Sequence, residues 1–265
     1  ETCVPLSNRK NEEHHHRTPH TTRAPQVEHS TSHFHHLPAH TTRRTTHAPP
    51  EHKITYAPQT THKAHSKNDP KLFCFEVVCT KPDSYEPALV QAQLRRGVSI
   101  FACDTFTVFS NPGHIILGGN WTTTKIHVEE ASMGNMNQPG TTTTSWLNTM
   151  IFQQAWILVR NDGRFRHHDW VVKVDPDAVF FPDRLRELVR PNTHPSGEWY
   201  FLNCNRFPPS PPGKAKLYGS AEVFSRKAIE LYLDRKDDCI HNLDWHHWGE
   251  DYYMQECMDR LKVMA

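Results

Sequence analysis

The sequence lacks long apolar runs and a strong excess of charge. None of its apolar stretches reaches the ~18–20 residues that a membrane-spanning helix needs, so we expect no such helix in this chain. The formal net charge of the 265 residues is only +1. Without a basic surface, a protein has no general attraction for nucleic acid or for an anionic membrane. The composition therefore argues against both kinds of partner.

Large apolar residues are scarce in residues 1–69, where His, Thr and Pro dominate. Such a segment cannot bury enough apolar surface to offset the entropy of ordering it. We expect a disordered stalk over residues 1–69, whose threonines can carry O-glycans. A metal-binding tail is the alternative, but the irregular spacing of the histidines favours the stalk. Apolar runs at strand and helix spacing begin near Pro70, and they predict one folded domain over residues 70–265.

Three common motifs are missing from the sequence: the paired CxxC spacing, the P-loop and the G-x-G-x-x-G fingerprint. Their absence argues against a zinc module and against the usual Gly-rich nucleotide loops. Seven cysteines are present, and the sequence does not decide how they pair. Together with the sequon Asn120-Trp121-Thr122 and the Thr/Pro-rich segment, they favour the secretory pathway.

The apolar pattern alternates between strands and helices along the folded part. Strands are predicted over residues 71–80, 100–109, 169–174 and 198–204. Helices are predicted over residues 86–97, 145–163, 182–189, 225–234 and 248–263. In the second helix one face is expected to hold Leu147, Met150, Ile151, Gln154, Ala155 and Leu158, and other faces Trp146, Phe152 and Trp156, so that the helix is largely buried. Residues 114–144 have no clear pattern and are expected to form a mobile surface. The alternation implies an α/β domain with a mostly parallel sheet flanked by helices.

Two carboxylates, Asp175 and Asp177, directly follow the apolar strand "WVVKV". Ligands of parallel sheets bind beyond the carboxyl ends of the strands. Pro176 favours an extended Asp175, and in an extended chain both acids point to one side. Because close carboxylates repel unless a cation intervenes, we expect Mn²⁺ or Mg²⁺ here, completed by substrate phosphates. The alternative is a plain Asp-Pro-Asp turn, which the apolar flanking residues make less attractive.

The segment "DWVVKVDPDAVFFPDRL" resembles the DxD region of GT-A-fold glycosyltransferases, in particular the fringe-like and β-1,3-glycosyltransferase group. Two later segments follow in the order of that group. "YGSAEVFSRKAI" resembles its small residues before V-x-S-x-x-A, and "WGEDYYMQECM" resembles its acidic pair before a helix. The likeness extends over about residues 170–261. It departs from the group at Ala221, where glycine is common.

This resemblance implies a Rossmann-like GT-A fold and a metal-dependent, inverting sugar transfer. The donor would be a nucleotide-diphosphate sugar, and the acceptor a hydroxyl of a glycan or glycoprotein. The implied location is the Golgi lumen, with any membrane anchor outside this chain. Asp175 and Asp177 would hold the metal and contact the donor.

The resemblance also implies roles for the later acids and small residues. Asp251 would be the catalytic base and Glu250 its neighbour, although both could simply complement the dipole at a helix start. Gly219 and Ser220 would lie near the donor or acceptor, or form only a tight turn.

Two further residues are candidates for donor binding. Asp104, expected midway along the second strand, matches an acid with which GT-A proteins often hold the nucleotide, unless it is solvated or caps the core. Lys173 could neutralise Asp175 or meet a phosphate, unless it is an ordinary strand lysine. The group often completes its metal site with a later His, and none follows His247. We therefore expect an incomplete metal site or a chain truncated at its C-terminus.

Two other classes of function stay open. One is a metal-dependent nucleotidyl or phosphoryl transferase, and the other is a non-catalytic secreted protein that binds carbohydrate or metal. Mn²⁺-dependent binding of a nucleoside diphosphate would argue against the second. The donor sugar, its base and the acceptor have no readable code in the sequence.

Overall fold

The computed structural model describes residues 68–193, 195–204 and 215–265. The stalk predicted over residues 1–69 falls outside this part, except for Asn68 and Asp69. The strands are β1 (Leu72–Cys79), β2 (Thr105–Asn111), β3 (Ile116–Gly118), β4 (Trp121–Thr122), β5 (Thr124–Lys125), β6 (Trp170–Val174) and β7 (Ala221–Ser225). The α-helices are α1 (Glu86–Arg96), α2 (Thr149–Asp162), α3 (Pro182–Val189), α4 (Arg226–Asn242) and α5 (Glu250–Arg260). No helix in the described ranges is both long and apolar enough to span a membrane.

The central sheet has the strand order β5-β2-β1-β6-β7. In this sheet β5, β2, β1 and β6 are parallel, and β7 runs antiparallel to β6. The predicted α/β class with a mostly parallel sheet is therefore confirmed. Because β7 starts opposite the end of β6, with Ala221 beside Val174, the residues just before β7 lie at the carboxyl edge of the parallel strands.

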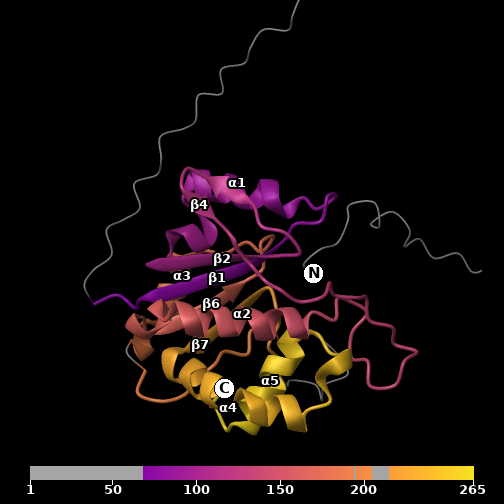
Figure 1. Ribbon diagram of the computed structural model, residues 1–265. Helices are drawn as coiled ribbons and strands as arrows, with labels where there is room; N and C mark the ends of the chain where they lie inside the picture. Colours follow the sequence, from indigo (N-terminus) through magenta and orange to yellow (C-terminus); the bar gives the residue numbers. More distant parts are fainter. Residues whose placement is uncertain (1–67, 194, 205–214) are drawn as a thin grey trace, which may run out of the picture. The chain divides into compact units, whose positions relative to one another are not determined.

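Both faces of the sheet are covered, which explains the continuous apolar character of its strands. Alternate residues of β1 point to opposite faces. Phe73 and Phe75 pack in a core with α2, α4 and α5, whereas Leu72 and Cys74 pack in a second core with α1 and α3. Figure 1 shows α1 on one side of the sheet and α2, α4 and α5 on the other.

Helix boundaries follow the predicted signals. Gly97 and Gly163 end α1 and α2 with positive φ values of 61° and 74°, which glycine adopts without a Cβ clash. Ser225 begins α4, and its Oγ accepts a hydrogen bond from the backbone N–H of Ala228. In α5, the expected apolar face is buried, with Tyr253 and Met254 among its members.

Several boundaries differ from the prediction. The second strand begins at Thr105, because Ser99–Ala102 form a 3-10 turn and Cys103 is bonded to Cys74 of β1. Residues 198–204 add only isolated bridges, not a strand of the sheet. The segment predicted to be a mobile surface, residues 114–144, contains the short strands β3, β4 and β5.

The helix α2 is largely buried as expected, with Ile151 and Ala155 in the core, but its expected face is only partly right. Met150 is 47% exposed, whereas Phe152 and Trp156 are buried. Trp156 packs edge-on against Phe75 of the sheet, with 4.7 Å between ring centroids. Leu147 precedes the helix altogether. A sequence with apolar residues on every side of a helix does not reveal which side meets the sheet.

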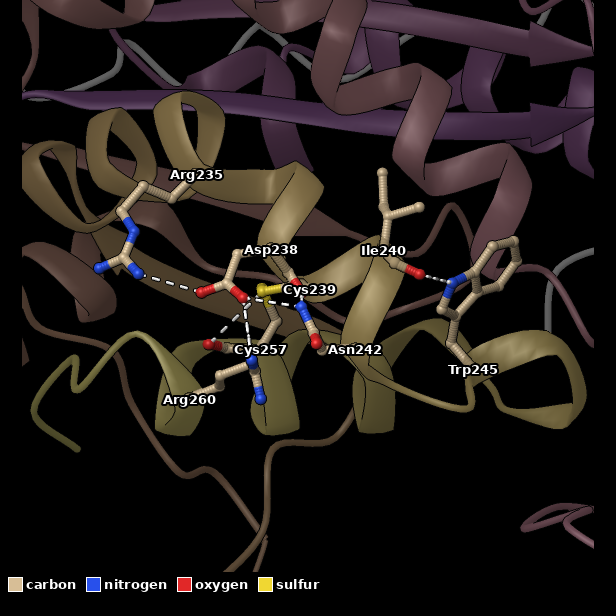
Figure 2. The surroundings of a disulfide bond; sticks show 8 residues. All are labelled: Arg235, Asp238, Cys239, Ile240, Asn242, Trp245, Cys257 and Arg260. Carbon is tan, nitrogen blue, oxygen red and sulfur yellow. Dashed lines mark hydrogen bonds and ion pairs between the residues drawn. A yellow bond between two sulfur atoms is a disulfide. The ribbon is translucent and has the colours of Figure 1, made fainter.

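The last two helices are joined by a disulfide bond and an ion cluster (Figure 2). Cys239 of α4 is bonded to Cys257 of α5. Beside it, the carboxylate of Asp238 accepts hydrogen bonds from Arg235, Asn242 and Arg260. This junction fixes the direction of α5, whose first turn carries Glu250 and Asp251.

Candidate active site

The Asp175-Pro176-Asp177 segment forms a turn at the carboxyl end of β6, and hydrogen bonds from two sides fix it. The backbone N–H of Asp175 donates to the carbonyl of Ser220 at 3.0 Å, so the segment is tied to the start of β7. From the α1 side, the Tyr85 hydroxyl donates to Asp177 Oδ2 at 2.6 Å, and Gln93 Nε2 donates to the carbonyl of Pro176 at 2.8 Å. The metal site and the Asp-Pro-Asp turn, which were the two alternatives for this segment, are thus compatible, because the turn holds both acids at the end of β6.

Asp175 and Asp177 line a cleft with a volume of about 430 Å³. Most of the predicted site residues line it: Asp175, Asp177, Gly219, Ser220, Glu250 and Asp251. They come from three distant parts of the sequence, namely the end of β6, the loop before β7 and the start of α5. Ligand sites at the carboxyl edge of parallel strands are what this architecture favours.

Lys173 lies under the cleft and is only 1% exposed. Its Nζ is 2.8 Å from Asp175 Oδ1 and 3.4 Å from Glu222 Oε1, and it also pairs with Glu250. It donates in addition to the carbonyl of Gly219 at 2.7 Å. Of the two predicted roles, the structure places Lys173 as the counter-ion of Asp175, and it does not line the cleft.

The carboxyl groups around Lys173 outnumber its single positive charge. Burial alone would lower the pKa of Lys173, but the nearby carboxylates outweigh it and raise the pKa well above its ordinary value. Burial, together with repulsion from Glu250, raises the pKa of Glu222. Burial also raises the pKa of Glu76, with Glu86 and Asp175 adding to the effect. One buried ammonium therefore serves several carboxyl groups, and the raised pKa values favour the protonated, neutral form of those that it does not neutralise.

Asp251 faces the cleft from the first turn of α5. Its Oδ2 accepts from the backbone N–H of Gly219 at 3.2 Å, and its Oδ1 accepts from Tyr252 N–H at 2.7 Å. An added Cβ at Gly219 would lie 3.2 Å from Glu250 Oε1 and 3.5 Å from Lys173 Nζ. Glycine at this position thus lets the loop before β7 approach the ion cluster.

Asp104 is not brought to this cleft. It precedes β2 and is not midway along it, so it sits at the amino edge of the parallel strands. Its Oδ2 accepts from Leu72 N–H and from Arg186 Nη2, both at 2.8 Å. We therefore leave Asp104 out of the candidate site, since it has the core-capping role that was its alternative.

Sequence reasoning missed the residues that come from the start of α2. Thr143, Ser145, Trp146 and Asn148 also line the cleft. Asn148 Oδ1 accepts from the backbone N–H of Glu250 at 3.1 Å, so the side chain caps α5 and not its own helix. An Asn directly before an apolar helical pattern was the available signal, but it indicated a cap for the wrong helix.

The described residues contain no group of three or more His, Cys, Asp or Glu side chains arranged to hold a metal ion. Asp175 and Asp177 are the two candidate ligands, and each has one oxygen engaged by Lys173 or Tyr85. Mg²⁺ and Mn²⁺ commonly bind one or two carboxylates and take further oxygens from substrate phosphates and water. The donor set fits an ion bound with its substrate, not one held in a closed protein cage.

No family model matches the sequence, and no curated protein matches it. Among solved structures, the chain is similar to that of a glycosyltransferase involved in the glycosylation of the major capsid of PBCV-1. The two are 11% identical, with a TM-score of 0.35, over 67% of this chain and 72% of that chain. A likeness this weak says nothing about the reaction, and the α/β fold class is assigned from the topology of the sheet alone.

Proposed function

We propose that the protein is a metal-dependent glycosyltransferase that moves a sugar from a nucleotide-diphosphate sugar to an acceptor hydroxyl with inversion. The observation that carries the proposal is the meeting of Asp175, Asp177 and Asp251 in one cleft at the carboxyl edge of the sheet. These acids belong to the first and third of the segments that resemble the fringe-like and β-1,3-glycosyltransferase group, and the second segment adds Gly219 and Ser220 to the same cleft. Their proximity is what that resemblance requires.

The roles follow from the chemistry of each position. Asp175 and Asp177 would hold Mn²⁺ or Mg²⁺, and the ion when bound would offset the negative charge of the diphosphate leaving group. Lys173 is a positioning residue, because it ties Asp175 to Glu250 and to the carbonyl of Gly219. Ser220 and Gly219 form the cleft wall on which the donor would lie.

Asp251 is the proposed general base. One of its carboxylate oxygens takes the proton of the acceptor hydroxyl as that oxygen bonds to the anomeric carbon of the donor. The bond from this carbon to the diphosphate oxygen breaks, and the nucleoside diphosphate leaves with the electron pair. A single displacement of this kind inverts the configuration at the anomeric carbon.

The described disulfides, Cys74–Cys103 and Cys239–Cys257, support a place in the secretory pathway, and we propose the Golgi lumen. Disulfides persist in oxidising compartments and are rare in the cytosol.

Calorimetry with a panel of nucleoside diphosphates and Mn²⁺ tests the proposal. Binding should require Mn²⁺ and should be lost in Asp175→Ala and Asp177→Ala, because both acids face the cleft. Asp183→Ala is the matched control, since its carboxylate is 60% exposed on α3 and belongs to the other edge of the sheet. Unchanged affinity in the first two variants would place the site elsewhere. No nucleotide binding by the parent protein would favour a non-catalytic carbohydrate- or metal-binding protein.

A further inference from the structure

A second cavity adjoins the cleft on the far side of Asp251. Its volume is about 480 Å³, and it shares Thr143, Tyr218, Gly249 and Asp251 with the cleft. Pockets of about 300–1,000 Å³ are of the size that encloses a small molecule. The carboxylate proposed as the base therefore stands at the junction of two spaces, each large enough for one reactant.

The two cavities differ in chemical character. The cleft is lined by Asp175, Asp177 and Glu250 in addition to Asp251, which suits a cation and phosphates. Among the described residues that line the second cavity, Asp251 is the only acid and Lys216 the only base, so their charges balance. The rest of that lining includes Met136, Leu217, Tyr218, Tyr252 and Gln255. Apolar and aromatic surface with a few polar groups suits a neutral ligand.

The two tyrosines of the second cavity are held by their neighbours. The side chain of Asn203 makes two hydrogen bonds to the backbone of Tyr218. Its Oδ1 accepts from Tyr218 N–H at 2.7 Å, and its Nδ2 donates to Tyr218 C=O at 2.9 Å. The ring of Tyr252 packs on Trp248, with centroids 4.6 Å apart. The backbone at Tyr218 is thus fixed, and the supported ring of Tyr252 loses little freedom when a ligand binds.

We propose that the second cavity is the acceptor subsite and that it binds a sugar ring. A tyrosine offers a flat apolar face together with a hydroxyl, which matches the C–H face and the hydroxyl edge of a sugar. One hydroxyl of that sugar would meet Asp251, while the donor occupies the cleft on the other side. The acceptor role rests on the proposed function, whereas saccharide binding rests on the cavity alone.

Ligand-observed saturation-transfer NMR with a panel of methyl glycosides and disaccharides tests this subsite. Met136→Trp should obstruct the cavity, and Tyr252→Ala should remove a stacking face. Tyr252→Ala should weaken saccharide binding about tenfold, as expected for the loss of one aromatic contact, and Met136→Trp should weaken it at least as much because it fills the space of the ligand. Tyr252→Phe keeps the ring and should bind nearly as the parent does.

Met133→Trp is the matched control for Met136→Trp. The two methionines are 53% and 58% exposed, and Met133 lines neither cavity. Saccharide affinity that survives both Met136→Trp and Tyr252→Ala would overturn the proposal. So would a site that takes Ser- and Thr-containing peptides, rather than sugars, and loses them in Met136→Trp.

Calorimetry with a nucleoside diphosphate and Mn²⁺ on the same samples separates this inference from the proposed function. Nucleotide binding without saccharide binding would overturn the subsite and leave the function standing. Saccharide binding without nucleotide binding would overturn the function and leave a saccharide site. The subsite variants should keep the nucleotide affinity of the parent protein.

Discussion

The two edges of the sheet each bury a basic side chain among acids, but the balance of charge differs. At the amino edge, Arg186 is 2% exposed and pairs with Asp104 and Asp183. Both acids are partly exposed, so water shares in their solvation. At the carboxyl edge, Lys173 is shared by Asp175, Glu222 and Glu250, which are nearly inaccessible.

This difference separates a structural ion pair from a site prepared for a ligand. At the amino edge the two carboxylates reach water, and the guanidinium of Arg186 ties α3 to the loop before β2. At the carboxyl edge several buried carboxyl groups share one ammonium beside an open cleft, and burial raises the pKa values of Glu222 and Glu250. Buried charge without compensation is costly, and it is found where a cation or a reaction makes use of it.

The largest expected effect compares one acid at each edge. Asp251→Asn keeps the size of the side chain but removes the base, so turnover should fall roughly 10²–10⁴-fold with donor affinity unchanged. Asp104→Asn should leave turnover unchanged and lower only the stability, because Asp104 caps the amino edge. Initial rates and donor calorimetry measure both. Equal turnover in the two variants would remove Asp251 from the mechanism.

The second comparison removes the cation at each edge. Lys173→Met should lower the free energy of unfolding by about 3–5 kcal/mol, because it leaves buried carboxylates uncompensated. Arg186→Met should cost less, since Asp104 and Asp183 can be hydrated. Adding Glu250→Gln to Lys173→Met should restore part of the loss. Urea unfolding gives all of these values, and a larger loss for Arg186→Met would contradict the charge argument.

The smallest effect concerns the pH dependence of stability. Glu76 is buried, and its pKa is raised well above the ordinary 4.5. The folded state therefore holds this proton more tightly than the unfolded state, and stability is lost as the pH rises from 4.5 through the folded pKa. One such group contributes a slope of at most about 1.4 kcal/mol per pH unit.

Glu76→Gln should flatten that slope, because the amide does not titrate. Glu187→Gln, at an exposed position of α3, is the control and should leave the slope unchanged. Chemical unfolding at a series of pH values measures the slopes. Parallel curves for the parent protein and Glu76→Gln would show that Glu76 does not bind a proton in this range.

Much of the fold could be predicted from local patterns. The ends of α1 and α2 were marked by Gly97 and Gly163, and the start of α4 by Ser225, because these three caps are made by residues adjacent to their own helices. The apolar strand before Asp175 and the acidic start of α5 were also readable. The prediction was wrong for the start of the second strand, next to the Cys74–Cys103 disulfide, and for the exposed Met150 on α2, because contacts with distant segments decide both.

The sequence by itself determined the α/β alternation and the three acidic or small-residue segments that form the cleft. Only the tertiary structure decided the edge on which each acid lies, which separates Asp104 from Asp175. It also decided that Cys239 pairs with Cys257, that Lys173 serves several buried carboxyl groups and that Asp251 borders two cavities. The physical reason is that the period of a strand or helix fixes which residues share a face, whereas the order and direction of neighbouring strands depend on contacts between distant segments.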